Sequence, residues 1–468
     1  MKELLSDAHA RSVRYLESLS KRPVQPDDDA LARLSELSVP LPEDPVPPEE
    51  VLSRLDELGS PATIANAGPR YFGFVTGGVL PVSLAANWLA GAWDQNAHFV
   101  VGSPTAAALE NVALSWILDI LDLPDTWGGG FVTGTTMGNF SGLVAGRHAV
   151  LKQAGWDVEA KGLFGAPEVH VVVGEEAHTT LLQALALAGF GRERVTQVPV
   201  DHQGRMKADA MPKLSGPSIV CLQAGNVNSG SFDRIDQIGA EIARDHDAWI
   251  HVDGAFGLWA KASPQHAHLV EGLAQVDSIA TDLHKWLNVP YDAGLALYRD
   301  PDAARSALSI TAAYLPAGDE RQPCDYTPES SRRARGVEIW AALASMGRSG
   351  LADLVARNCR YAQRFADGLR DAGFEILNDV VLNQVLVSFG SAERTQEVIT
   401  VIQKEGTCWC SGTTWKGRAA MRISVSSWAT SEDDVEQSLA AIIRVASPPS
   451  NTSGATSRSR PPTRGSRP

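Results

Sequence analysis

Four groups of polar residues in this sequence each follow a short apolar run, and together they could carry out chemistry. The groups are Gly134-Thr135-Thr136, Glu175-Glu176-Ala177-His178, Asp253 and His284-Lys285. Short apolar runs predict buried strands, and ligands of an open parallel sheet sit beyond the carboxyl ends of its strands. We therefore expect a phosphate cradle, an imidazole, a carboxylate and a lysine amine on one rim. Those are the groups that a pyridoxal phosphate (PLP) site needs.

The lysine of this set, Lys285, lies in the segment TDLHKWLNVP. Its amine could form a covalent bond with the aldehyde of PLP, provided that it can lose its proton. Partial burial and neighbouring cations favour the neutral amine. Lys285 follows a predicted strand and stands between His284 and Trp286. This setting argues against the interpretation of Lys285 as an ordinary surface lysine.

Asp253 and the glycine-rich turn could hold the two ends of the cofactor. Asp253 lies in WIHVDGAFG, and a carboxylate that faces the pyridine nitrogen keeps that nitrogen protonated, so the ring can accept electrons. An aspartate at this point could instead cap a helix. The segment GGGFVTGTTMGNF predicts a helix start whose N–H groups and threonine hydroxyls bind phosphate. His178 could stack on the ring and contact the substrate carboxylate, or could be a core histidine with satisfied hydrogen bonds.

The elements that must position these groups alternate along the middle of the chain. Helical patterns such as FSGLVAGRHAVLKQ and TTLLQALALAG alternate with apolar strands such as VHVVVG, SIVCLQAG and AWIHVDG. Strands without polar alternation are buried on both faces, which is typical of a parallel sheet covered by helices. The pattern predicts an α/β fold with a large, doubly wound, mostly parallel sheet over residues 61–330.

Three further parts flank this large domain. Residues 1–60 predict a helical arm with a proline-rich connector, too small to bury a core alone, which must pack on the main body or on a partner subunit. Residues 331–446 predict a smaller α+β domain. Residues 447–468 are rich in Ser, Pro and Arg, so we expect them to be disordered.

The composition excludes several classes of protein. Of the 468 residues, 44% are hydrophobic and 21% charged, which is a globular balance over two or three domains. The net charge of −14 argues against nucleic acid as a partner. We expect no membrane segment, no signal peptide and a cytoplasmic location. Five scattered cysteines fit reduced thiols, and the Cys408-Trp409-Cys410 pair lacks a second pair for zinc, so no metal is expected.

At this point the sequence resembles a known family. The blocks HVDGAFG, DLHKWL and GEEAH resemble those of the group II PLP-dependent amino-acid decarboxylases, over roughly residues 60–445. The resemblance implies fold type I and a homodimer with sites at its interface. It also implies that Lys285 binds the cofactor covalently, that Asp253 pairs with the ring nitrogen, and that His178 stacks on the ring.

Further roles are implied by the same resemblance. Ala255 would pack on the opposite face of the ring, and the phosphate would meet a group of residues: Thr135, Thr136, Met137 and His284. Tyr314 in SITAAYLPAGD would be the proton donor on a mobile loop that closes over a neighbouring subunit's site. Arg422 in MRISVS would meet the substrate carboxylate, although a structural ion pair is an equal interpretation.

Two segments depart from the family pattern. Where many relatives carry a Gly-Thr-Thr turn, this chain has Gly225-Asn226-Val227-Asn228, so the amide of Asn226 takes the place of a hydroxyl at the cofactor. Asn96, in NAHFVVGSPTAAALEN, resembles a substrate-side residue, but its segment matches neither the aromatic nor the acidic decarboxylases.

The predicted function is decarboxylation of an L-amino acid, which releases carbon dioxide and an amine. The same fold supports decarboxylation coupled to oxidative deamination, which gives an aldehyde, ammonia and peroxide, and also transamination or retro-aldol cleavage. Tyr314 favours the simple decarboxylase, because a phenol can protonate the substrate Cα before oxygen reacts there. A PLP-binding protein without turnover is a further alternative, and the Asp253/Lys285 pair argues against it.

Overall fold

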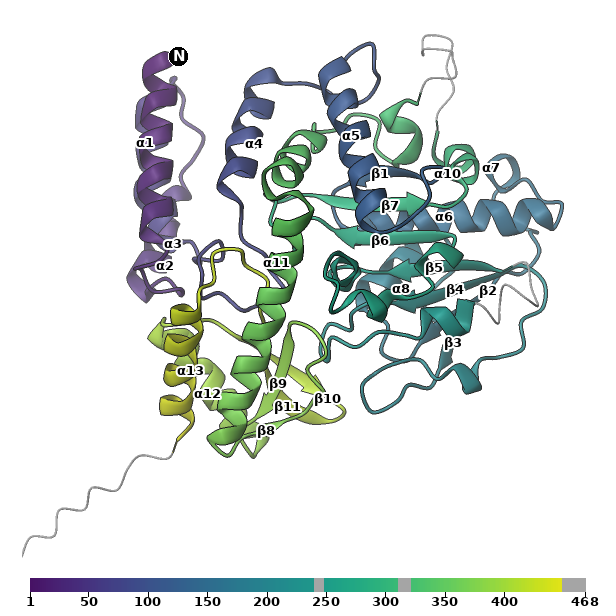
Figure 1. Ribbon diagram of the computed structural model, residues 1–468. Helices are drawn as coiled ribbons and strands as arrows, with labels where there is room; N and C mark the ends of the chain where they lie inside the picture. Colours follow the sequence, from purple (N-terminus) through teal and green to yellow (C-terminus); the bar gives the residue numbers. More distant parts are fainter. Residues whose placement is uncertain (240–247, 310–320, 448–468) are drawn as a thin grey trace, which may run out of the picture.

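Two β-sheets organise the protein, and a bundle of N-terminal helices lies beside them (Figure 1). The computed structural model describes residues 1–239, 248–309 and 321–447. The larger sheet has seven strands in the order β1-β7-β6-β5-β4-β2-β3. Their bounds are β1 (Gly128–Val132), β2 (His170–Gly174), β3 (Val195–Val198), β4 (Ser218–Gln223), β5 (Trp249–Asp253), β6 (Ser278–Asp282) and β7 (Gly294–Tyr298).

The sheet is parallel except at β7. This strand pairs antiparallel with both β1 and β6, whereas the other neighbours are parallel. Two reversals bring β1 back to the direction of β6, so the carboxyl ends of β1 and β6 lie at the same edge of the sheet. The expected doubly wound, mostly parallel sheet is confirmed, and β3 and β7 are strands that the sequence patterns did not indicate.

Alternate residues of each central strand enter two separate hydrophobic cores. In β5, Ile250 and Val252 belong to one core, while Trp249 belongs to the other. A strand that is buried on both sides needs apolar residues without polar alternation, as the sequence has here. The helices around this sheet are α4 (Pro81–Trp93), α5 (Pro104–Ile120), α6 (Thr135–Gln153), α7 (Val158–Lys161), α8 (Thr179–Leu187) and α10 (Pro301–Leu308).

The second sheet is antiparallel, in the order β10-β11-β9-β8. Its strands are β8 (Glu375–Ile376), β9 (Gln384–Ser388), β10 (Ser411–Trp415) and β11 (Arg418–Ser424), and its helices are α12 (Ala392–Glu405) and α13 (Glu432–Ala446). The long helix α11 (Gly336–Asp371) runs from the larger sheet to this one (Figure 1) and breaks at Gly347, whose φ is +60°. The sequence patterns predicted two helices there and only two of the four strands.

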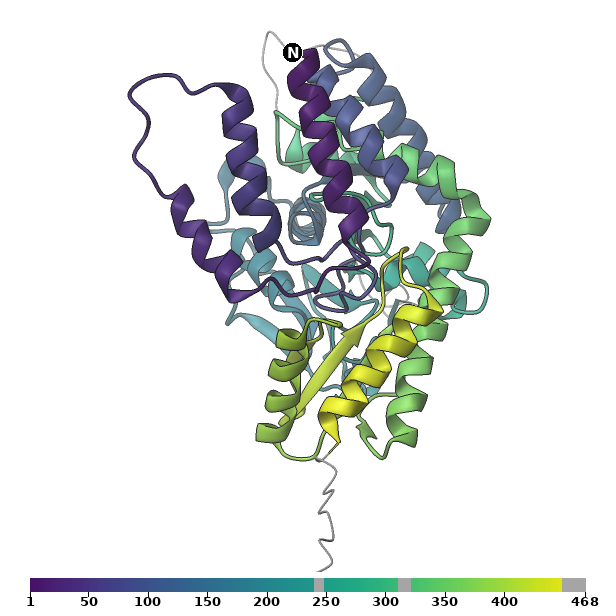
Figure 2. The ribbon, with the colours of Figure 1, turned by 90° about the vertical axis from the view of Figure 1, so that its left-hand side faces the viewer.

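The N-terminal helices α1 (Lys2–Ser18), α2 (Asp28–Arg33) and α3 (Pro48–Ala62) stand along one side of the molecule, and the proline-rich connector projects from it (Figure 2). Short 3-10 helices complete the chain: η1 (Leu34–Leu37), η2 (Ala208–Ala210), η3 (Gly257–Ala262), η4 (Ala267–Val270), η5 (Leu273–Gln275) and η6 (Pro323–Tyr326). The domain boundaries remain predictions, and nearly all of the expected disordered tail lies outside the described residues.

Within the described ranges, no helix combines the length and the apolar character needed to cross a membrane. All five cysteines are free and buried.

Candidate active site

A cavity of about 350 Å³ lies where the central strands of the larger sheet end. It is lined by Thr133, Gly134, Thr135, Thr136, His178, Thr180, Gln223, Gly225, Val227, Asp253, Ala255, Phe256, Asp282, His284 and Lys285. The four strand ends that the sequence singled out therefore meet on one rim. The double reversal through β7 is what brings the turn after β1 to this rim.

The N-terminus of α6 forms one wall of the cavity and could hold an anion. Thr135 is 4% exposed, and its buried Oγ1 has no hydrogen-bond partner in the described part of the chain. Gly294 allows the turn to approach β7, because a Cβ there would lie 2.5 Å from Gly134 Cα. Backbone N–H groups at a helix start attract phosphate. This end of the cavity therefore suits a phosphate group.

Asp253 also lines the cavity and is 3% exposed. Its Oδ2 accepts a hydrogen bond from Asn139 Nδ2 at 3.0 Å, and its Oδ1 accepts one from Ala255 N at 3.2 Å. Burial raises the pKa of this carboxyl, and the hydrogen bond from Asn139 opposes that rise. The helix cap considered for this aspartate is not seen, since only 3-10 helix η3 follows it.

Lys285 is held between residues that cannot move easily. Leu283, Trp286 and Leu287 are fully buried, which fixes the segment after β6. The Lys285 side chain is 22% exposed, and its Nζ lies 2.7 Å from Asp282 Oδ2. Such partial burial next to a carboxylate holds the amine at one place in the cavity.

Asp282 is a site residue that the sequence reasoning missed. Its Oδ1 accepts from Thr135 N at 2.6 Å, so the carboxylate joins β6 to the start of α6. Burial works to raise its pKa, but Lys285 and His284 outweigh burial, and the pKa is lowered. The signal was the spacing of Asp282 and Lys285, three residues apart in the motif DLHK.

Two histidines complete the walls. His178 caps α8, because its Nδ1 accepts from Thr180 N at 3.3 Å, which leaves Nε2 as the ring donor toward the cavity. His284 Nδ1 accepts from Ala293 N at 3.1 Å, and its ring stacks on Tyr291. Burial lowers the pKa of both histidines. Neutral imidazoles at these positions could pack against a flat aromatic ring.

Several predicted site residues are not among those that line this cavity. Asn226 is 1% exposed, and its side chain already bonds Asn228 N, Ser229 N and Gln223 Oε1. Asn96 accepts from Arg332 N and lines a different cavity. Met137 and Arg422 are not among the lining residues. Tyr314 lies outside the described residues.

The positive charge of Arg422 nevertheless acts on this cavity. Its side chain is buried, its NH1 lies 3.4 Å from Asn228 Oδ1, and its Nε has no partner in the described chain. Burial lowers its pKa, and the charge of Arg422 contributes to lowering the pKa of His178. No ion pair of Arg422 occurs within the described residues. An anionic group could therefore be accepted beside it.

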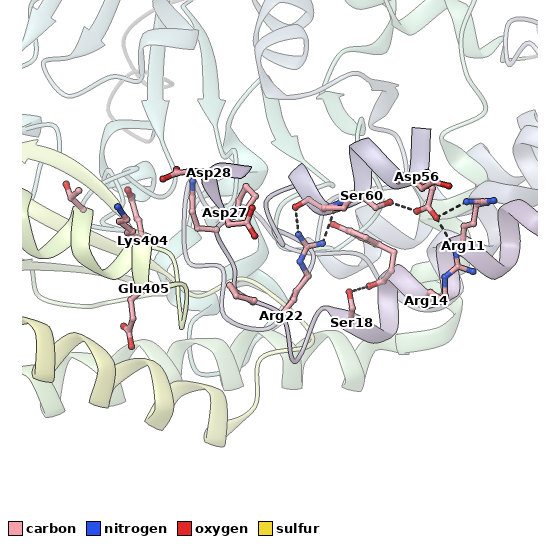
Figure 3. A pocket seen from close by; sticks show the side chains of 18 residues that line it. Arg11, Arg14, Ser18, Arg22, Asp27, Asp28, Asp56, Ser60, Lys404 and Glu405 are labelled. Atoms are coloured by element: carbon pink, nitrogen blue, oxygen red, sulfur yellow. Dashed lines mark hydrogen bonds and ion pairs between the residues drawn. The ribbon is translucent and has the colours of Figure 1, made fainter. Parts of the chain in front are cut away.

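A larger cavity, of about 880 Å³, shares none of these lining residues and lies between the N-terminal helices and α12 (Figure 3). Several of its charged side chains are already paired: Asp56 lies between Arg11 and Arg14, and Arg22 donates to the carbonyls of residues 60 and 61. Charges that are paired in this way stabilise the contact between the N-terminal helices. The smaller cavity has the unpaired hydroxyl, the buried carboxylate and the amine, so it is the better candidate for chemistry.

The residues of the smaller cavity fit PLP. The buried Thr135 hydroxyl and the start of α6 suit the phosphate, Asp253 suits the ring nitrogen, and Lys285 suits the aldehyde. All three groups line this one cavity, so a single flat cofactor with three different ends could contact them together.

Comparison with known proteins identifies the family. Residues 33–390 match the family described as "Pyridoxal-dependent decarboxylase conserved domain". Tryptophan decarboxylase 1 of Oryza sativa subsp. japonica is 27% identical over 455 residues, covering 88% of this chain and 87% of that protein. The 4-hydroxyphenylacetaldehyde synthase of Rhodiola rosea is 26% identical, covering 90% of each. A crystal structure of Oryza sativa TDC with PLP and tryptamine superposes with a TM-score of 0.86 at 24% identity, covering 95% and 97% of the two chains. This chain therefore belongs to the pyridoxal-dependent decarboxylase family, and PLP is its cofactor.

Proposed function

We propose that this protein removes the α-carboxylate of an L-amino acid as carbon dioxide and releases the amine, with Lys285 and Asp253 as its principal catalytic residues. The observation that carries this proposal is the placement of the Lys285 amine, the buried Asp253 carboxylate and the α6 N-terminus around one cavity. Bound PLP supplies a ring that accepts the electron pair left at Cα when carbon dioxide departs.

The residues of the chain orient the reaction. Lys285 Nζ would hold the cofactor through its aldehyde and lies where a substrate amine would meet that group. Asp253 would hold a proton at the ring nitrogen, and its burial would strengthen that electrostatic interaction. His178 and Ala255 would lie against the two faces of the ring, while Thr135, Thr136 and His284 would surround the phosphate.

Arg422 is proposed to bind the substrate carboxylate. A buried guanidinium without an ion pair among the described residues is a costly arrangement unless an anion joins it. Tyr314 is proposed as the group that protonates Cα. The roles of Asn96, Asn226 and Met137 at the substrate and the cofactor stay proposals from the family resemblance.

The deciding experiment measures products. The PLP-loaded protein is incubated with the common L-amino acids, and carbon dioxide, amine, aldehyde and peroxide are measured. We expect equal amounts of carbon dioxide and amine from one class of amino acid. Aldehyde and peroxide as the main products would replace this proposal by the oxidative route, which the likeness to an aldehyde synthase makes the second candidate.

We further propose a homodimer. An apolar groove of about 560 Å³ lies between α1, α3 and α4, and Leu55 and Trp88 in it are 59% and 41% exposed. Apolar surface of this kind is typical of an interface. Deletion of residues 1–60 should therefore cause loss of the dimer or of solubility, measured by light scattering after size-exclusion chromatography. A stable, active monomer after deletion would contradict the proposal.

A further inference from the structure

A continuous line of buried hydrogen bonds runs behind the Asp253 carboxylate. Trp249 Nε1 lies 2.8 Å from Ser278 Oγ, which lies 2.8 Å from His251 Nδ1. His251 Nε2 lies 2.9 Å from Asn139 Oδ1, and Asn139 Nδ2 lies 3.0 Å from Asp253 Oδ2. The four bonds link the core of the protein to the carboxylate in the cofactor cavity.

The two ends of this line fix the direction of every bond in it. An indole nitrogen can only donate, and an ionised carboxylate can only accept. Trp249 therefore donates to Ser278. The Ser278 hydroxyl could donate to His251 Nδ1 or accept from it, and the carboxylate end of the line decides that it donates. His251 must then carry its proton on Nε2 and donate to the Asn139 oxygen, so that the Asn139 amide directs its N–H groups to Asp253. A reversal at any link would turn the Asn139 oxygen toward the carboxylate.

Solvent cannot replace these bonds. Asn139, His251 and Ser278 are fully buried, and Trp249 is 5% exposed. Burial also lowers the pKa of His251 to about 3, so the ring is neutral at physiological pH. A neutral ring has one donor and one acceptor, as the line requires.

Two glycines allow helix α6 to pack closely against this line of hydrogen bonds. A Cβ at Gly142 would lie 2.7 Å from His251 Nδ1 and 3.0 Å from Ser278 Oγ. A Cβ at Gly146, one turn further on, would lie 2.7 Å from the Trp249 ring. The two glycines allow α6 to come close enough for Asn139, on the same helix, to reach Asp253.

We propose that Asn139 and His251 are positioning residues that orient the Asp253 carboxylate and keep it ionised toward the ring nitrogen of PLP. This inference rests on the proposed role of Asp253. It differs from a packing role, because packing requires only the shapes of these side chains, whereas positioning requires the donor at the His251 Nε2 position.

Two substitutions at one residue separate these roles. His251→Gln keeps an amide donor near the position of Nε2, whereas the shorter side chain of His251→Asn cannot reach Asn139. Apoprotein of each variant is titrated with PLP, and the absorption spectrum of the bound cofactor is recorded, with Asp253→Asn as the reference. Thermal unfolding of the apoproteins reports on packing.

We expect His251→Asn to raise the Kd for PLP and to lower kcat by about tenfold to a hundredfold each, the factor that loss of the charge-assisted bond from Asn139 to Asp253 would produce once the Asn139 amide is free to turn. Its spectrum should shift in the direction that Asp253→Asn shows, while KM for the amino acid changes little. His251→Gln should restore affinity and spectrum to within about threefold of wild type.

Ser278→Ala is a second variant, which removes one hydroxyl and so tests the line even if His251→Asn does not fold. Without the hydroxyl, the His251 proton can move to Nδ1 and the Asn139 amide can turn, so the same spectral shift should appear. An unchanged spectrum and PLP affinity in these variants, beside clear changes in Asp253→Asn, would overturn the positioning role. No change in Asp253→Asn itself would overturn the proposed role of Asp253, and the inference with it.

Discussion

Acid should destabilise the fold through His251 in particular. The folded protein holds this ring neutral, with its pKa lowered from an ordinary value of 6.5 to about 3 by burial. The unfolded chain exposes the ring and restores its ordinary pKa. Between pH 6.5 and pH 3 the unfolded chain therefore binds more protons at this residue than the folded protein does. The stability that neutral His251 gives is present above pH 6.5 and is lost as the pH falls toward 3.

The size of this effect follows from the two pKa values. Lowering the pH from 7 to 5 stabilises an unfolded histidine of pKa 6.5 by about 2 kcal/mol. The folded histidine gains almost nothing over this range, because its pKa lies well below 5. His251 alone should therefore remove about 2 kcal/mol from the free energy of unfolding. The full difference between the two pKa values, about 5 kcal/mol, is reached only near pH 3.

The assay is urea unfolding of the apoprotein at pH 7 and pH 5, at one fixed protein concentration because the protein is proposed to be a dimer. His251→Gln removes the titrating ring, so its loss of stability between the two pH values should be smaller than that of wild type by about 2 kcal/mol. His170→Gln, at an exposed histidine, is the control and should behave as wild type does. Equal losses in wild type and His251→Gln would refute the reasoning.

Three further outcomes are expected. Lys285→Ala should abolish the cofactor adduct that borohydride reduces, and an adduct that persists in mass spectra would remove Lys285 from its role. Gly142→Ala should lower the free energy of unfolding by about 1–3 kcal/mol through overlap with His251, whereas Gly91→Ala, which has open space around it in α4, should not destabilise. Tyr314→Phe should leave release of carbon dioxide intact but shift the product from amine to aldehyde and peroxide, and an unchanged amine yield would exclude Tyr314 as the proton donor.

The convergence of the site could be predicted because it depends on a general property of parallel sheets. Asp253 is the last residue of its strand, and Thr135, His178 and Lys285 each follow one; strands that share a direction end at one edge. Asn96 and Arg422 were assigned from family resemblance alone. The structure places both outside the cavity lining of a single chain. Their distance from the cavity depends on how other parts of the chain fold, which their local sequence does not determine.

The side chains that support Asp253 were harder to predict, although their motifs were in view. His251 stands two residues before Asp253, so strand alternation places both on the same face of β5. The sequence does not say which helix covers that face. Asn139 becomes a partner only when α6 packs there, and that packing depends on contacts between residues more than a hundred positions apart.

One helix therefore governs both ends of the proposed cofactor site. The first residue of α6, Thr135, lies at the predicted phosphate end, and Asn139, four residues or about 6 Å along the axis, contacts the carboxylate at the nitrogen end. Gly142 and Gly146 set how closely that helix approaches β5 and β6. A change that moves α6 away from the sheet should disturb phosphate binding and the Asp253 carboxylate together. A change confined to His251 or Ser278 should disturb only the carboxylate, which is why the cofactor spectrum distinguishes the two.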